Sequence, residues 1–352
     1  MMKWRRGLSF LVVLLLAACG RTGDVAPTVM PAQNDLQMPA GYHAEQAWEG
    51  LQGPTQMIWG PDGWLWLAQL NGPENAGTGQ IIALSLPDGQ QRLLLDNLFK
   101  PTGLAFLDGA LWIAAGNTLL RAPLSPDGRL EPPQTILADL PYNSRSNGTL
   151  TVTPDGFLIY ETSGSRQGNQ PRPGSATLWR LDPAHPDRPQ PIATGLKGAY
   201  AHTFDAAGRL WITEIGDDKV NGTAPPDELN LVVMGADFGW PACFGFQEVA
   251  ENFGGTPTQC AQTRSPVALF PAAATPTGVL ASPWEPDTLL VALWVRGEVV
   301  RVPVRYDGDN ARGESLPFIS GLDHPQHLLP LPDGGLLLSD YGRGRLYRIT
   351  RD

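Results

Sequence analysis

The chain has 352 residues, of which 40 are glycine, 34 are proline and only 17% are charged. Glycine and proline break helices and populate turns, so this composition argues against a helical protein, while a hydrophobic content of 42% argues against a disordered one. The net charge of −10, with no long basic run, argues against a nucleic-acid partner, since phosphate binding needs clustered lysine and arginine.

Residues 1–19 resemble a bacterial lipoprotein signal peptide. Three basic residues lie among the first six, and residues 8–18 form an apolar run that is too short to span a bilayer. The run ends in Leu16-Ala17-Ala18-Cys19, which resembles a lipobox and implies that Cys19 is lipidated. The resemblance predicts an exported protein that a lipid anchor alone holds to the bacterial cell envelope. The alternative is an ordinary signal peptide with a chance cysteine.

Residues 20–40 are rich in proline, glutamine, threonine and alanine, without a periodic apolar pattern. This composition predicts a flexible tether between the lipid and a domain over residues 41–352.

Two cysteines remain within that domain. Export would place Cys243 and Cys260 in an oxidising compartment, where an even pair tends to close into a disulfide. The alternative is two free buried thiols.

Six copies of one hairpin run along the domain. Each copy has a short apolar strand, a turn of the Asp/Gly type and a second apolar strand. Successive turn glycines Gly63, Gly109, Gly156 and Gly208 are 46, 47 and 52 residues apart. The six hairpins occupy residues 53–67, 100–113, 148–159, 200–212, 275–291 and 324–338.

Repeats of this length with three or four strands are typical of propeller blades. The sequence therefore predicts an all-β protein, a six-bladed β-propeller. Residues 42–49 precede the first repeat and could pair beside residues 345–349, which would close the ring and remove an exposed edge. A β-sandwich has similar strand content but does not explain six copies at nearly constant spacing.

An insertion after the fourth hairpin gathers carboxylates. A hard cation such as Ca²⁺ binds carboxylate and carbonyl oxygens, so this segment is a candidate calcium site. The alternative is a solvated acidic loop. The candidate side chains are Asp217, Asp218, Asp227 and Glu228.

Two blocks in this insertion resemble the quinoprotein glucose/sorbosone dehydrogenase family. They are Pro226-Asp227-Glu228-Leu229-Asn230 and Asp237-Phe238-Gly239-Trp240-Pro241. The resemblance extends over nearly all of the domain and implies a six-bladed propeller that binds pyrroloquinoline quinone (PQQ) and Ca²⁺ at the mouth of its channel. It also implies oxidation of a small sugar, an aldose or sorbosone.

The resemblance assigns roles to particular residues. It implies that the backbone carbonyls of Gly216 and Asp217 hold the cofactor's Ca²⁺, and that Glu228 binds a second, structural Ca²⁺. It places Arg296 against the carboxylates of the quinone, and Lys197 where the family has an arginine that faces the cofactor.

The acidic net charge of the chain means that a PQQ site would need its own group of cations. PQQ is a tricarboxylate, so an acidic protein must concentrate local cations to bind it. Arg145, Lys197 and Arg296 each lie near the same end of their repeats, and we predict that they converge on one channel mouth with Gly216 and Asp217.

The third hairpin departs from the family. Its start, residues 142–150, contains no histidine where the family has its catalytic one, and arginine stays protonated and cannot serve as a base. His202, His324 and His327 lie at or just before inner strands of other blades, and His202 and His327 are the candidate replacements.

Three functions remain open at this point. The first is a PQQ- and calcium-dependent sugar dehydrogenase, in which hydride leaves the sugar for the quinone while a base removes the hydroxyl proton. The second is a non-catalytic propeller that binds a carbohydrate or a protein, which the missing histidine favours. The third is a calcium-dependent lactonase, by analogy of fold alone, and it would need several acidic side chains at the channel centre.

The lipobox predicts that a Cys19→Ser variant is released from the membrane fraction, because the anchor would have no attachment point. Fractionation and immunoblotting of the wild type and the variant test this. A variant that stays with the membranes would contradict the lipobox.

Overall fold

The computed structural model describes residues 36–143, 147–308 and 310–352, so Cys19 and Arg145 lie outside the described part. Within it, nearly all regular structure is β. Helical structure is limited to α1 (Pro257–Cys260) and a 3₁₀ turn, η1 (Glu251–Phe253). None of the described helices is long and apolar enough to cross a membrane.

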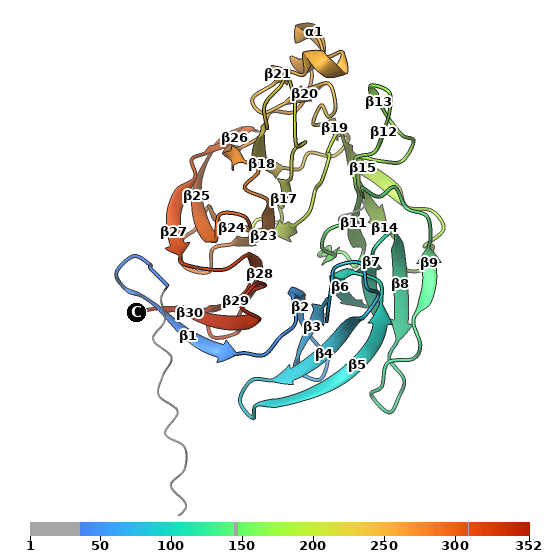
Figure 1. The fold of residues 1–352 in the computed structure, drawn as a ribbon, viewed down its shortest axis with the longest axis vertical. Helices are drawn as coiled ribbons and strands as arrows, with labels where there is room; N and C mark the ends of the chain where they lie inside the picture. The colour runs from blue at the N-terminus through green and yellow to red at the C-terminus, as the bar shows by residue number, and fades with distance from the viewer. Residues whose placement is uncertain (1–35, 144–146, 309) are drawn as a thin grey trace, which may run out of the picture. The chain divides into compact units, whose positions relative to one another are not determined.

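Six antiparallel sheets form the blades of a propeller, which confirms the predicted fold (Figure 1). Blade 1 contains β2 (Pro54–Trp59), β3 (Leu65–Gln69), β4 (Gly79–Ser85) and β5 (Gln90–Leu98). Blade 2 contains β6 (Pro101–Leu107), β7 (Ala110–Ala115), β8 (Thr118–Pro123) and β9 (Gln134–Leu137). Blade 3 contains β10 (Thr151–Val152), β11 (Leu158–Thr162), β14 (Thr177–Leu181) and β15 (Gln190–Thr194), with β19 (Ala236–Asp237) added in parallel.

The second half of the ring repeats the pattern. Blade 4 contains β16 (His202–Phe204), β17 (Leu210–Glu214), β18 (Pro226–Leu231) and β22 (Ala268–Ala272). Blade 5 contains β23 (Pro276–Ala281), β24 (Thr288–Leu293), β25 (Glu298–Asp307) and β27 (Leu316–Ser320), and β26 (Asn310–Gly313) pairs with the far end of β25. Blade 6 contains β28 (Pro325–Pro330), β29 (Leu336–Asp340), β30 (Arg345–Arg351) and β1 (Tyr42–Trp48).

The two ends of the domain close the ring. β1 pairs antiparallel with β30, from Tyr42 opposite Arg351 to Trp48 opposite Leu346, as the sequence predicts. The preceding segment also contacts the propeller, because Gln37 exchanges two backbone hydrogen bonds with Ser320. The described propeller unit therefore includes part of the segment assigned to the tether.

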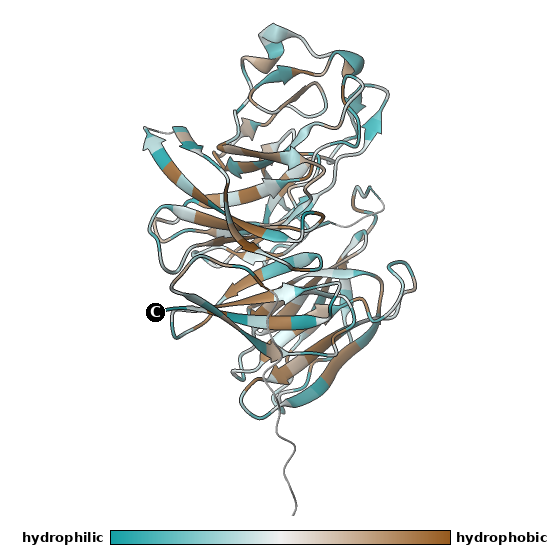
Figure 2. Ribbon diagram, turned by 60° about the vertical axis from the view of Figure 1, so that its left-hand side comes forward, coloured by the Kyte–Doolittle hydropathy of each residue, from teal (hydrophilic) through white to brown (hydrophobic). Residues whose placement is uncertain are grey.

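Apolar side chains pack between the blades. Six clusters of buried residues each join two neighbouring blades, and Figure 2 shows hydrophobic stretches along the strands. Trp66, Trp112 and Trp211 lie at the same place in the second strands of blades 1, 2 and 4, and each is at most 1% exposed. Because the hairpin is repeated, the same kind of apolar interface forms between each pair of neighbouring blades. The core of the propeller is therefore the sum of these interfaces.

Uncharged polar side chains cross the channel. The Gln56 amide accepts from the N–H groups of Leu104 (2.6 Å) and Leu150 (2.9 Å), so it joins three blades. Gln326 donates to the Tyr200 hydroxyl at 2.8 Å, across from blade 6 to blade 4. A lactonase centre would need several carboxylates here, and these crossing side chains carry none.

Five of the six inner strands follow a residue with a positive φ. These residues lie at the same end of the ring, because each begins an inner strand. They are Gly53 (65°), Lys100 (52°), Gly148 (61°), Thr275 (56°) and His324 (64°). The fold thereby presents a lysine, a threonine and a histidine around one channel mouth, in a conformation that costs non-glycine residues about 1–3 kcal/mol each.

A disulfide closes the insertion between β18 and β22. The sulfurs of Cys243 and Cys260 are 2.07 Å apart, so the predicted pair is present. It ties α1 to the two-stranded ribbon of β20 (Cys243–Phe244) and β21 (Glu248–Val249). A second ribbon, β12 (Arg166–Gln167) with β13 (Gln170–Pro171), extends from blade 3.

A Cys243→Ser/Cys260→Ser variant should lose about 3 kcal/mol of unfolding free energy, the chain-entropy contribution of a loop of this length. Denaturant unfolding of the oxidised wild type and the variant measures the difference. Equal midpoints, or two free thiols in the unreduced wild type by mass spectrometry, would show that the bond contributes nothing in solution.

Candidate active site at the channel mouth

The structure brings two predicted site residues into direct contact. The Lys197 ammonium donates to the carbonyl oxygen of Gly216 at 2.6 Å. The backbone N–H of Lys197 donates to a carboxylate oxygen of Glu214 at 2.9 Å, which fixes the lysine beside the end of β17. One cation and one carbonyl of the expected cofactor site therefore lie together at the mouth.

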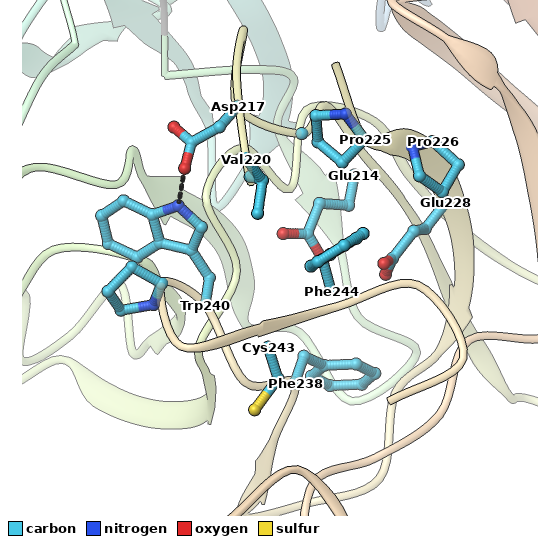
Figure 3. Close-up of a pocket in the computed structure, with 12 residues that line it drawn as sticks. Glu214, Asp217, Val220, Pro225, Pro226, Glu228, Phe238, Trp240, Cys243 and Phe244 are labelled. Carbon is cyan, nitrogen blue, oxygen red and sulfur yellow. Dashed lines mark hydrogen bonds between the residues drawn. The ribbon is translucent and has the colours of Figure 1, made fainter. Parts of the chain in front are cut away.

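The Asp217 side chain is held from two sides. Its carboxylate accepts from the Trp240 indole N–H at 2.9 Å, as Figure 3 shows, and from the Arg166 guanidinium at 3.3 Å. Arg166 comes from the β12–β13 ribbon and packs over the Phe253 ring at 3.7 Å. No sequence pattern pointed to Arg166, because this residue lies outside the repeated hairpins.

The Asp227 carboxylate holds the Gly216 turn in place. Its two carboxylate oxygens accept from the backbone N–H of Gly216 (2.8 Å) and of Thr275 (2.7 Å). Burial raises the pKa of this carboxyl, and these two N–H donors partly offset that rise. The side chain is 1% exposed, so the alternative of a solvated acidic loop is wrong for Asp227.

Glu214 and Glu228 face one another across β17 and β18 and point into one enclosed space (Figure 3). The cavity between them has a volume of about 20 Å³, enough for one water molecule or one ion. Burial and the neighbouring carboxylates raise the pKa of both groups. The buried Asn230 amide donates to Glu228 at 3.0 Å, and its own oxygen has no hydrogen-bond partner among the described residues.

This donor set fits a divalent cation. Two facing carboxyls whose pKa values are raised by burial and by the neighbouring Asp227, together with an unsatisfied amide oxygen, are stabilised when a hard cation lies between them. Across residues 36–143, 147–308 and 310–352, no group of three or more acidic, histidine or cysteine side chains could hold a metal. Backbone and amide oxygens would therefore complete the coordination.

The three predicted cations do not all meet. Arg296 lies at the same end of the ring, in the turn between β24 and β25, but its side chain is 53% exposed and pairs with Glu298 at 3.4 Å. Among the described residues it forms no hydrogen bond or ion pair with Lys197, and Arg145 lies outside the described residues. The described part thus places one predicted cation on Gly216 and a second on the outer rim.

The two candidate histidine bases are poorly placed. His202 is 7% exposed, and its ring lies 3.4 Å from the Thr149 hydroxyl. The His327 ring accepts from the backbone N–H of Met57 at 3.4 Å. Burial lowers the pKa of each to about 4. Both rings serve contacts between blades, so the structure argues against either as the base that meets a substrate.

Glu161 is a buried acid that the sequence analysis did not identify. It lies on β11 with 1% exposure, and one carboxylate oxygen has no partner among the described residues. Burial raises its pKa to about 8, although the nearby Lys197 opposes the rise. Its apolar strand context resembles an ordinary core position, so only the fold reveals the titratable group.

Part of the chain matches a known family profile. Residues 184–316 match the sequence profile described as "Glucose / Sorbosone dehydrogenase". The chain carries a glucose/sorbosone dehydrogenase region. The predicted family resemblance is thereby confirmed, and the region supports an oxidoreductase of the sugar dehydrogenase type.

Solved structures share the fold of this glucose/sorbosone dehydrogenase-like propeller at low sequence identity. The PQQ-bound form of an aldose sugar dehydrogenase from Streptomyces coelicolor is 20% identical and has a TM-score of 0.70, covering 90% of this chain and 100% of that chain. A calcium structure of a Trichoderma reesei protein of Carbohydrate-Active Enzymes Family AA12 is 15% identical, with a TM-score of 0.73 and coverage of 90% and 97%. The apo form of the soluble aldose sugar dehydrogenase from Escherichia coli is 16% identical, with a TM-score of 0.67 and coverage of 88% and 100%. A search of curated sequences finds no match.

The buried Glu161 predicts that the free energy of unfolding falls as pH rises between its ordinary pKa of 4.5 and about 8. In this window the folded chain keeps a proton that the unfolded chain has released, so higher pH favours unfolding by about 1.4 kcal/mol per pH unit. Denaturant unfolding at several pH values measures the slope. Glu161→Gln should reduce this slope by about 1.4 kcal/mol per pH unit, the contribution of one proton. Glu131→Gln, at an exposed position, should leave the slope unchanged. An unchanged slope in Glu161→Gln would contradict the assignment.

Proposed function

We propose that this protein is a PQQ- and calcium-dependent dehydrogenase that oxidises a small sugar, an aldose or sorbosone. One observation carries the proposal. Every described residue to which the sequence assigns a cofactor or metal role lies within the matched region, residues 184–316: Lys197, Gly216, Asp217, Glu228 and Arg296. The family match and the contact between Lys197 and Gly216 therefore support the same site.

The residues present suit a polycarboxylate cofactor. Lys197 and Arg296 would pair with carboxylates, and charge-assisted hydrogen bonds of this kind are the stronger ones in proteins. The carbonyl groups of Gly216 and Asp217 would face the cofactor's Ca²⁺, for which the Lys197 ammonium would have to leave its present acceptor. When bound, the quinone would supply the acceptor for the hydride that leaves the sugar carbon.

A second Ca²⁺ would occupy the space between Glu214 and Glu228. Two facing carboxylates without a cation repel one another and are costly to ionise in a buried place. A cation there would also stabilise β17 and β18 next to the Gly216 turn. We further propose that a lipid on Cys19 holds the enzyme at the bacterial cell envelope.

Binding of the cofactor gives the direct test. Isothermal titration of PQQ into the full-length protein with Ca²⁺ present should show saturable binding. Arg296→Ala should weaken it by about 1–3 kcal/mol, the usual loss for a charge-assisted pair, while Arg129→Ala, an exposed arginine of a β8–β9 loop, should leave it unchanged.

Absence of saturable heat in the wild type would overturn the dehydrogenase proposal and favour a propeller that only binds a carbohydrate or a protein. Equal affinities of the wild type and Arg296→Ala would remove Arg296 from the site while leaving the cofactor in place.

A further inference from the structure

A histidine–carboxylate pair lies on the rim of the same channel mouth. The ring Nδ1 of His324 is 2.6 Å from a carboxylate oxygen of Asp323. A carboxylate only accepts hydrogen bonds, so Nδ1 carries a hydrogen, and in the neutral ring the lone pair then lies on Nε2. Nε2 takes part in no hydrogen bond with the residues that the structure describes, and the side chain is 39% exposed.

The backbone holds this pair in place. Asp323 donates its N–H to the buried Asp340 carboxylate at 2.9 Å, and the carbonyl of His324 accepts from the N–H of Tyr341 at 3.0 Å. Gly342 leaves the space that Asp323 fills, since a Cβ at that position would lie 2.4 Å from the carboxylate. The pair directly precedes β28 and is held by hydrogen bonds and close packing against the end of β29 and the turn that follows it.

Aromatic rings form a wall beside the imidazole. The Trp294 ring lies 3.9 Å from the His324 ring and 5.9 Å from that of Tyr341. Tyr341 in turn lies against Gly53 at the start of blade 1, where a Cβ would be 3.0 Å from its ring. Partly exposed aromatic faces beside polar groups are suited to the apolar faces of sugar rings.

Hydrogen bonds connect this wall to the candidate cofactor site. Asp227 holds the N–H groups of Gly216 and Thr275, and the carbonyl of Thr275 accepts from the N–H of Trp294 at 2.9 Å. These bonds link the Gly216 turn of blade 4 to Trp294 of blade 5, whose ring contacts His324 of blade 6. Beneath it, Gln326 and Tyr200 cross the channel at 2.8 Å.

Both carboxylates and arginines lie around the pair. Arg343 lies 3.6 Å from the Asp340 carboxylate behind Asp323, and Arg296 pairs with Glu298 beside Trp294. Burial and the Glu74 carboxylate raise the pKa of Tyr341, so this phenol stays neutral near pH 7. Asp323 is thus the carboxylate that directly contacts the imidazole.

We propose that His324, oriented by Asp323, is the catalytic base of the proposed dehydrogenase and replaces the histidine missing from blade 3. The hydroxyl O–H bond of the sugar breaks and its proton goes to Nε2 of His324. The C–H bond breaks and its hydrogen leaves with the electron pair, as a hydride that the quinone-class oxidant of the proposed function receives, and a carbonyl forms on the sugar. This assignment rests on the proposed function.

A readout that needs no turnover comes from diethyl pyrocarbonate, which modifies accessible imidazoles. Peptide mass spectrometry of the full-length protein, with and without PQQ and Ca²⁺, follows the modification of each histidine. D-glucose should slow the modification of His324 severalfold, while His185 should react at an unchanged rate. His185 is a matched control, because it also pairs with an aspartate (Asp182, 3.1 Å) but is on an outer loop of blade 3. No protection of His324 would overturn the proposal.

Kinetics of the reconstituted enzyme give the second readout. His324→Gln should lower kcat by about 10²-fold or more, the usual contribution of a general base, and remove the acidic limb of the pH–rate profile. Asp323→Asn and Gly342→Ala should lower kcat with little change in KM for glucose, because both disturb the orientation of the ring. His185→Gln should behave as the wild type, and PQQ titration checks that each variant still folds and binds.

The outcomes separate the two proposals. A wild type without PQQ binding or turnover overturns the proposed function, and the base with it. An active wild type whose His324→Gln variant keeps its kcat and its pH profile overturns only the assignment of the base.

Discussion

The candidate site depends on one buried carboxylate. Asp227 uses its two oxygens to hold two backbone N–H groups, those of Gly216 in blade 4 and of Thr275 in blade 5. The two groups belong to different blades, and the bond to each is short. Their relative position fixes both the carbonyl that Lys197 contacts and the Trp294 backbone beside His324. Removing the carboxylate would leave two buried donors without acceptors and would free the rim on both sides.

Much of the fold follows from the turns. The spacing of Gly63, Gly109 and Gly156 predicts the blades, because a hairpin turn fixes where the two strands beside it begin and end. Apart from β1, which residues 42–49 predict, the outer strands were not identified. Most of β5 is exposed, so its residues show no strong alternation between apolar and polar positions. The β12–β13 ribbon has two residues in each strand, which is too short for any periodic pattern.

Site residues could be predicted only where neighbouring residues in the chain form a recognisable motif. The blocks around Glu228 and Trp240 led to the family, and through it to Lys197 and Gly216. Glu161 and Arg166 act through partners that are distant in the sequence or through burial, and neither leaves a local pattern. The histidines show the limit most clearly: His327 belongs to an inner strand and packs towards blade 1, whereas His324 precedes that strand and stays at the rim. Three residues separate an interior position from an accessible one.

Closure of the ring by the two ends of the domain constrains how the protein can fold. Glu45 of β1 contacts Arg348 of β30, 303 residues later in the chain. Contacts between residues so far apart in the sequence form late in folding. Closing the long loop between them costs conformational entropy before the contacts stabilise the chain. Until residues 345–351 are available, blade 6 lacks β30, so β29 and β1 each present an unpaired edge, the kind of surface on which chains aggregate. A newly made chain with this topology therefore remains prone to aggregation until β30 is in place.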